Sequence, residues 1–319
     1  MLNEKDFYNM GKIKCSLIKV VVKNSGILGG PYYAEVDHEY NGNMLHIEIT
    51  QGLTRTICIS ANSQATTEQL WEAFSLIERL LMVFDGRFYI IESVSFSGEV
   101  SNEVEYSSYA QECISRRLSY CHTDPAYCYS HHVFLRFNTV LSSTIISKWV
   151  QLQDELDIVH QVALYNVADT GITHDVKCAN FIECLEPMVE IIGLYDCFFP
   201  CLKPGDRTTT LKMCIDAVIS KYGKDIFAEE YSANKEKFLQ ILVNTRNRVM
   251  HIKRNQPTEK YLSGEESVLY LVKLSHLYRV VILSLLGIDY AQYQCVLIKS
   301  VQQWNKWNGV LDNFIKGLK

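Results

Sequence analysis

Hydrophobic residues follow two different periods along the chain. Up to about residue 97, apolar positions gather in short runs rich in β-branched side chains, separated by turn sequences such as Tyr-Asn-Gly-Asn. These runs predict β-strands over residues 13–22, 44–50, 55–60 and 88–96. Before the last of them, apolar residues recur at spacings of three and four, which predicts a helix over 67–84 with Thr67 as its N-cap.

From about residue 142 the period is helical, whereas residues 98–140 show no clear period. The pattern predicts helices over 142–168, 174–199, 207–228, 233–254, 265–287 and 290–315. Proline- and glycine-containing breaks fall between most of them, and long helices joined by short loops predict a bundle. We therefore expect an α+β protein with a mixed, β-rich amino-terminal domain over 1–140 and an all-α bundle over 141–319.

Length, composition and net charge indicate what class of protein this is. A chain of 319 residues with 48% hydrophobic and 21% charged residues is typical of a folded protein with two domains, not of a disordered one. The net charge of −5 gives no overall attraction to nucleic acid. Any contact with RNA must therefore come from a local basic patch.

Two features predict a cytoplasmic protein without a membrane partner. The 11 cysteines are odd in number and form no Cys-x-x-Cys pair, and no apolar run follows the charges in Met1–Lys14, so we expect free thiols and no signal peptide. The longest apolar stretch, 268–288, is interrupted by Lys273, His276 and Arg279. It predicts a core helix and not a membrane span.

One predicted helix has a polar face that carries candidate chemistry. Over residues 237–254, a rotation of ~100° per residue places an apolar stripe on the face that must meet the bundle core. This stripe consists of Phe238, Leu242, Thr245, Val249 and Ile252. Asn247, His251 and Arg254 fall roughly opposite, with Arg246 on their flank, so we predict that this cluster points away from the core.

A second apolar strip, formed by Leu239, Val243 and Met250, lies between the core stripe and the polar cluster. Apolar residues in this position are unusual on a freely solvated face, so we expect another surface to cover them. A second copy of the chain is the partner that symmetry favours. The strip therefore predicts a two-fold homodimer with these three residues at or beside the contact.

The polar cluster suits RNA cleavage. RNA carries its own nucleophile, the 2′-hydroxyl, so the protein must move protons near neutral pH, which His251 can do, and must stabilise negative charge on the phosphate, which Arg246 can do. Asn247 is expected to orient the imidazole or to donate to a phosphate oxygen. Arg248, Lys253 and Arg254 would add positive charge for RNA binding. This chemistry requires no metal and no cofactor; on residue types alone, however, the same pattern is also typical of a merely solvated helix face.

The segment Arg246-Asn247-Arg248-Val249-Met250-His251 resembles the Arg-x-x-x-x-His motif of HEPN ribonucleases, including the asparagine after the arginine. Its setting, late in a long helix and before an apolar helix that ends in Leu-Leu-Gly-Ile, resembles the ApeA-like branch of that superfamily. The resemblance is clearest over about residues 174–290, and the β-rich region before the bundle is also similar to the amino-terminal half of ApeA-like proteins.

This resemblance implies a metal-independent endoribonuclease that serves as a toxin or abortive-infection effector in antiphage defence. It also implies a dimer in which the arginine and histidine of both copies line one cleft. Arg246 would bind the phosphate, His251 would transfer protons, and Asn247 would support them. The amino-terminal domain would then sense a trigger or hold an inhibitor. The alternative is a non-catalytic HEPN module that binds RNA or protein.

A Cys/His-rich segment, Cys121–His132, carries the other residues that suggest a metal. It contains Cys121, His122, Cys128, His131 and His132, and thiolate and imidazole are good zinc ligands. Its spacing matches no zinc motif, so ordinary loop and strand residues are the favoured interpretation.

Overall fold

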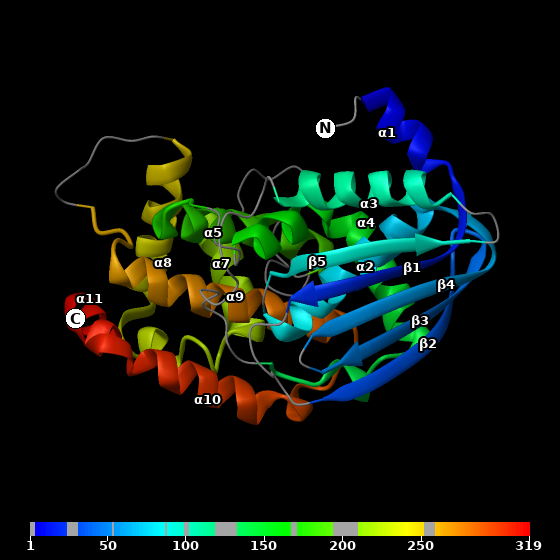
Figure 1. Ribbon diagram of the computed structural model, residues 1–319. Coiled ribbons are helices and arrows are strands. Elements are labelled where there is room, and N and C mark those ends of the chain that lie inside the picture. Colours follow the sequence, from blue (N-terminus) through cyan, green and yellow to red (C-terminus); the bar gives the residue numbers. More distant parts are fainter. Residues whose placement is uncertain are drawn as a thin grey trace. The chain divides into compact units, whose positions relative to one another are not determined.

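The structure is a computed structural model that describes residues 4–23, 31–52, 54–86, 88–98, 102–118, 133–166, 171–193, 210–251 and 259–319 (Figure 1). The chain forms two compact units: Met1–Gln151 together with Ala168–Thr170, and Leu152–Val167 together with Gly171–Lys319. The division falls inside α4 (Ser143–Asn166), whose backbone departs from helical geometry at Leu156. The domain boundary near residue 141 stays a prediction.

The first unit is built on a five-stranded antiparallel sheet in the order β2-β3-β4-β1-β5. Its strands are β1 (Lys14–Lys23), β2 (Tyr32–Tyr40), β3 (Asn43–Gln51), β4 (Arg55–Thr66) and β5 (Ile90–Ser97). Alternate residues of β1, β3 and β4, such as Ile18, Ile47 and Ile59, are buried, and α2 (Thr67–Asp85) contacts β1 and β4. Figure 1 shows this helix lying against the sheet. The α+β architecture that the hydrophobic periods predict is therefore present.

The cap of α2 differs from the prediction by one residue. Thr66, and not Thr67, is the N-cap: its side chain accepts a hydrogen bond from the backbone N–H of Gln69, whose side chain accepts one from the N–H of Thr66. This reciprocal pair satisfies two amides that the helix itself leaves without partners. Thr67 is instead buried, and its hydroxyl donates to the carbonyl oxygen of Met10.

Three elements of the first unit carry no clear pattern in the sequence: α1 (Glu4–Gly11), β2 and α3 (Glu103–Leu118). On β2 only Ala34 and His38 are buried, because the strand lies at the edge of the sheet and exposes most of its side chains. Aromatic and small residues, in place of aliphatic ones, form the buried side of α3. A search for periodic aliphatic residues therefore misses both.

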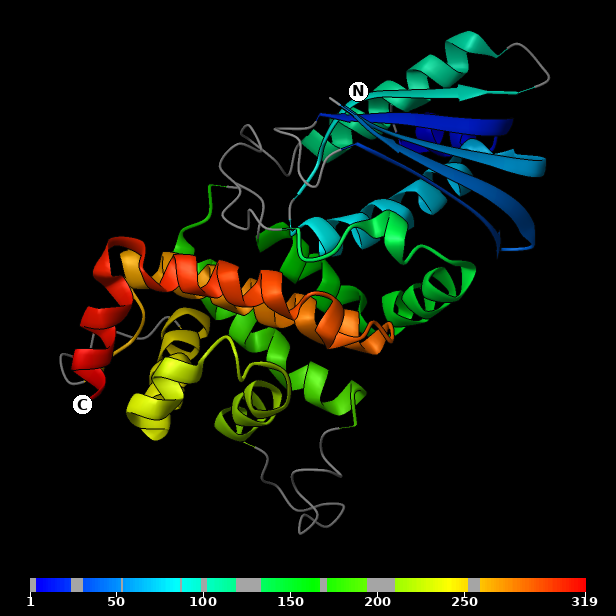
Figure 2. The same cartoon turned by 90° about the horizontal axis from the view of Figure 1, so that it is seen from below.

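The second unit is a bundle of helices, as predicted. It contains the second part of α4, α5 (His174–Ile191), α7 (Leu211–Tyr222), α8 (Ala228–Met250), α9 (Glu265–Leu285), α10 (Gln294–Asn305) and α11 (Val310–Leu318). α5, α7, α10 and α11 contact α9 (Figure 2), and Lys273 of α9 donates to Glu230 of α8. By length and composition α9 could cross a membrane, but 83% of its most apolar window is buried inside the fold, which supports the predicted core helix.

The predicted helix ranges in this unit differ from the structure at several points, of which two have a clear local cause. The single helix predicted over 290–315 is split, because Asn308 (φ 50°) and Gly309 (φ 66°) adopt left-handed conformations that a continuous helix does not contain. The helix predicted over 174–199 ends at Ile191, and Gly193 (φ 65°) follows it in a left-handed conformation.

Candidate active site

The carboxy-terminal half of α8 carries the sequence motif. Phe238, Leu242 and Thr245 are at most 1% exposed, so most of the predicted core stripe faces the core, whereas Val249 is half-buried. The hydroxyl of Thr245 donates to the carbonyl of Ile241 and accepts from the amide of Leu262, which fixes this part of the helix.

α8 ends earlier than predicted, at Met250, and His251 is its C-cap residue with φ −103° and ψ 5°. The imidazole is exposed and leaves the helix at its end instead of continuing along one face. Ile252, Lys253 and Arg254 lie outside the described residues, so the predicted core contact of Ile252 and the predicted RNA contacts of the two basic residues stay predictions.

Arg246 is the centre of a hydrogen-bonded group that joins two helices. Its Nε and Nη2 atoms donate to the two carboxylate oxygens of Glu183 on α5, the latter at 2.9 Å. Such a bidentate arrangement fixes the plane of a guanidinium group as well as its position. The hydrogen bonds to Glu183 raise the pKa of Arg246, against a smaller opposing effect of burial. Arg246 is therefore a permanently charged and oriented cation.

The other edge of the guanidinium group faces the remaining motif residues. Nη1 of Arg246 donates to Oδ1 of Asn247 at 3.0 Å and lies 3.1 Å from Nε2 of His251. Because a guanidinium group can only donate, this contact is a hydrogen bond when Nε2 carries a lone pair and the ring proton is on Nδ1. The structure thus brings Arg246, Asn247 and His251 into one contact group.

The sequence leaves two roles open for Asn247: orienting the imidazole or donating to a phosphate oxygen. In the structure its side chain contacts Arg246 and not the imidazole. Its Nδ2 atom has no hydrogen-bond partner within the described part of the chain. This side chain therefore retains two N–H donors for another acceptor, such as a phosphate oxygen.

Arg248 is directed elsewhere. Its guanidinium carbon lies 3.7 Å from the centre of the Tyr261 ring, and its Nη1 atom is buried without a hydrogen-bond partner among the described residues. The stacking holds Arg248 against the protein. The contact of Arg248 with RNA stays a prediction. Because Nη1 is buried, only the rest of the guanidinium group could make that contact.

The predicted dimer strip is only partly at the surface. Leu239 is 1% exposed within its own unit, so the prediction that it lies away from the core is wrong. The helical wheel fails here because helices pack against more than one side of α8, namely α5, α7 and α11. Val243 is half-buried and Met250 is 37% exposed, which leaves these two for contact with another surface.

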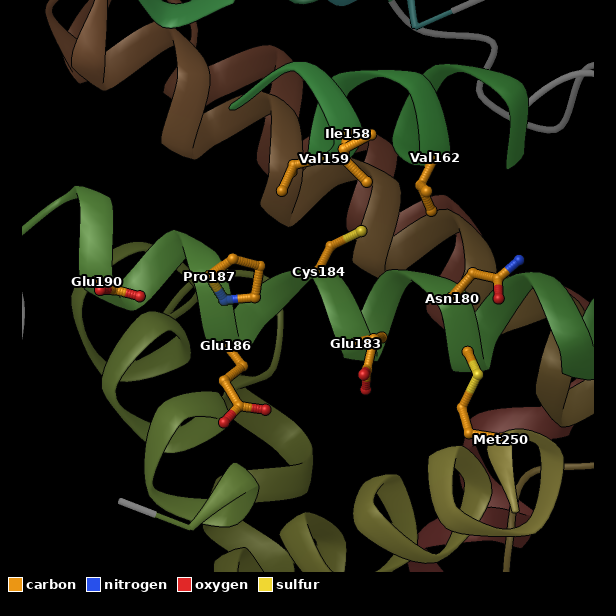
Figure 3. Close-up of a pocket in the computed structure, with 10 residues that line it drawn as sticks. All are labelled: Ile158, Val159, Val162, Asn180, Glu183, Cys184, Glu186, Pro187, Glu190 and Met250. Carbon is orange, nitrogen blue, oxygen red and sulfur yellow. The ribbon is translucent and has the colours of Figure 1, made fainter. Parts of the chain in front are cut away.

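A cavity of about 480 Å³ opens beside this group, between α4, α5 and Met250 (Figure 3). Ile158 and Val162 of α4 form one wall with Cys184 and Pro187 opposite, and Glu183 belongs to the α5 side. Figure 3 shows Glu183 and Met250 on facing helices at one side of the cavity. Ile158 is 70% exposed, so an apolar surface continues from the cavity mouth.

Sequence reasoning missed Glu183. The residue is 63 positions from Arg246, and its own helix carries several glutamates that all look alike in the sequence. Nothing in a single sequence pairs one of them with the arginine. Only the packing of α5 on α8 selects Glu183.

Among the described residues, one group has the donors and the spacing for a metal ion: Glu35, His46 and Glu48, on β2 and β3 of the first unit. Their ligand atoms lie within 4.8 Å of one another, and Nδ1 of His46 is 2.7 Å from a carboxylate oxygen of Asp37. The Cys121–His132 segment lies outside the described residues, so its role as a metal site is not tested.

Comparison with known proteins gives one finding. Residues 202–292 match the family model described as Apea-like HEPN, and this range includes α8, the motif and all of α9. No curated protein and no solved structure matches the chain. The match confirms the resemblance that the motif and its setting indicate.

Proposed function

Because the second unit contains a HEPN domain of the Apea-like type, of a superfamily generally associated with ribonucleases, we propose that the protein is a metal-independent endoribonuclease. The observation that carries this proposal is the contact group at the end of α8. The fixed guanidinium group of Arg246 lies within hydrogen-bond distance of an amide with unused donors and of an exposed imidazole. These are the groups that cleavage by the 2′-hydroxyl needs.

In the proposed reaction the 2′-oxygen attacks the adjacent phosphorus, and the bond to the 5′-oxygen of the next nucleotide breaks. His251 accepts the proton of the 2′-hydroxyl through Nε2, and a general acid returns a proton to the leaving 5′-oxygen. The products are a 2′,3′-cyclic phosphate and a 5′-hydroxyl. Arg246 and the Nδ2 group of Asn247 stabilise the negative charge that develops on the phosphate.

The hydrogen bonds of Arg246 suggest how substrate prepares the base. Of its five N–H groups, one on Nε and one on Nη2 are used by Glu183, and two on Nη1 face Asn247 and His251, which leaves one on Nη2. A phosphate that binds both terminal nitrogens must therefore displace one of the two acceptors of Nη1, and we propose that it displaces Nε2 of His251. Substrate binding would release the lone pair that accepts the proton.

The general acid is proposed to be His251 of a second copy in a homodimer. An apolar surface that includes Ile158 and Met250, both exposed, borders the contact group and would be covered in such a dimer.

We also propose a defence role as a toxin or abortive-infection effector in the cytoplasm, with the first unit as the site of a trigger or inhibitor. These parts rest on the family resemblance.

The test is cleavage of single-stranded RNA by the full-length protein and by His251→Ala. We expect the rate to fall about 10²- to 10⁴-fold, the range typical of a lost proton-transfer group. His174→Ala, at a partly exposed histidine of α5 outside the contact group, serves as the matched control and should cleave like the wild type. The exposed position of His251 predicts a stability change within about 0.5 kcal/mol.

Two outcomes would overturn the proposal. If His251→Ala cleaves RNA like the wild type, the assignment of His251 is wrong. If the wild type binds RNA or a protein partner but leaves RNA intact, the unit is a non-catalytic HEPN module.

A further inference from the structure

A second cavity of the helical unit, of about 400 Å³, lies where the end of α7 meets the turn between α9 and α10. α7 ends at Tyr222 and is followed by Gly223, where a side chain would be crowded because a Cβ would lie 3.1 Å from Ile219 and Phe227. On the other side, Gly287 (φ 83°) follows α9 in a left-handed conformation. Chain reversals at both glycines thus leave a hollow between these elements.

The cavity has aromatic and apolar walls. Tyr290 and Tyr293 pack edge to face with ring centres 5.3 Å apart and an angle of 82°, and Tyr222 lines the α7 side. Val280 and Ile288, both buried, line the same cavity. Aromatic and aliphatic surfaces of this kind bind planar ring systems by stacking and exclusion of water.

Two cations also line the cavity. Lys221 and Lys224 are exposed, and neither ammonium group forms an ion pair in the described part of the chain. Arg279, which is buried, lies near the same wall: burial raises the pKa of Tyr293 to about 12, and Arg279 opposes that rise. The potential beside the aromatic walls therefore favours an anionic group.

Asp225 is fixed at the edge of the same cavity. Its Oδ2 atom accepts hydrogen bonds from the Tyr290 hydroxyl at 2.5 Å and from Nε2 of Gln294 at 3.2 Å. Oδ1 has no hydrogen-bond partner among the described residues. A carboxylate held in this way is a common acceptor for the hydroxyl groups of a ribose.

We propose that this cavity binds a ribonucleotide, with its base against Tyr222 and Tyr290, a ribose hydroxyl on Asp225 and its phosphate at Lys221 and Lys224. The three kinds of group match the three parts of a nucleotide, and none of the lining residues belongs to the contact group around Arg246. The same chemistry is present in a free nucleotide and in an unpaired residue of an RNA strand. The site is independent of cleavage, so it can exist whether or not the proposed nuclease activity does.

The experiment measures binding to full-length His251→Ala, which prevents loss of the probe by cleavage. The probes are AMP, dAMP and phenyl phosphate by calorimetry, and a fluorescent RNA oligonucleotide by anisotropy. We expect AMP or the RNA to bind, dAMP about tenfold more weakly than AMP, and phenyl phosphate more weakly still, because the ribose hydroxyl and the base each lose a contact. Binding of AMP identifies a free nucleotide as a ligand, and binding of the RNA alone identifies a strand.

Matched variants separate this cavity from other sites of RNA contact. Lys221→Glu combined with Lys224→Glu should weaken binding at least tenfold, whereas Lys306→Glu with Lys316→Glu, the same change of charge at two other exposed lysines, should not. Asp225→Ala should remove the difference between AMP and dAMP, and Tyr290→Phe should retain base binding that Tyr290→Ala loses. Circular dichroism checks that each variant folds.

The proposal is overturned by any of three results: no probe binds, both double variants lose binding equally, or phenyl phosphate binds as tightly as AMP. Each of these leaves the cleavage assay of His251→Ala unaffected, so the failure of this site and the failure of the proposed function are distinguishable.

Discussion

The two ends of α8 each carry an ion pair with a neighbouring helix, in different surroundings. Near the amino-terminal end, Glu230 accepts from Lys273 of α9 at 2.5 Å and from the Tyr270 hydroxyl at 3.0 Å, and both charged side chains are at most 1% exposed. Lys273 also lies 5.5 Å from the centre of the Phe227 ring. At the carboxy-terminal end, Arg246 and Glu183 are 18% and 42% exposed.

The difference shows how burial separates a structural ion pair from a candidate reactive one. At the closed end, removal of water makes each unpaired charge very costly, so the groups are committed to one another. At the open end, water and ligands reach the pair, and Arg246 and Asn247 retain donors that no described residue uses. The closed end fixes the position of α8 on α9, and the open end leaves groups free for chemistry.

The largest effect should come from breaking the closed end. Lys273→Met leaves Glu230 as a buried charge without its cation, and we expect the free energy of unfolding to fall by about 3–5 kcal/mol. Urea denaturation followed by circular dichroism measures this. The double variant with Glu230→Gln should recover part of the loss, and a loss below about 1 kcal/mol for the single variant would contradict the comparison.

Breaking the open end should affect activity more than stability. Glu183→Ala releases the guanidinium group of Arg246, and loss of its orientation should lower kcat about 10- to 100-fold while KM changes less. The free energy of unfolding should change by no more than about 1 kcal/mol, as for other exposed pairs. Steady-state cleavage of RNA and urea denaturation measure the two quantities.

Two further variants control that measurement. Glu183→Gln keeps one acceptor oxygen and should be intermediate in kcat, and Glu190→Ala, on an exposed position of the same helix, should match the wild type. A rise in kcat for Glu183→Ala would show instead that the carboxylate competes with the phosphate for Arg246.

A smaller effect is expected from the apolar surface beside the open end. Ile158→Glu places a charge in the proposed dimer contact and should weaken dimerisation about tenfold, equivalent to about 1.4 kcal/mol. Analytical ultracentrifugation measures the dissociation constant. Val104→Glu is the matched control in the first unit, because Val104 is also highly exposed, at 76%. Equal dimerisation of both variants would remove Ile158 from the interface.

The smallest effect should follow removal of metal ions. Because proton transfer and charge stabilisation are assigned to His251 and Arg246, EDTA should leave the rate of RNA cleavage unchanged within about twofold. Loss of activity that one divalent ion restores would count against the proposed mechanism and direct attention to Glu35, His46 and Glu48.

The sequence by itself determined the elements whose residues repeat regularly. Aliphatic periods predicted four of the strands, α2 and the bundle, because each element must bury one face. The motif also placed Arg246, Asn247 and His251 in one short stretch of chain, but the contact of Arg246 with His251 forms where α8 ends and His251 leaves the helix.

Only the tertiary structure decided which groups those residues meet. Leu239 is buried because helices pack against several sides of α8, a fact that a wheel with one core face does not contain. Glu183 binds Arg246, and Tyr290 binds Asp225, across 63 and 65 positions of sequence. Such pairs form because packing brings distant helices together, and local periodicity carries no information about which helices those are.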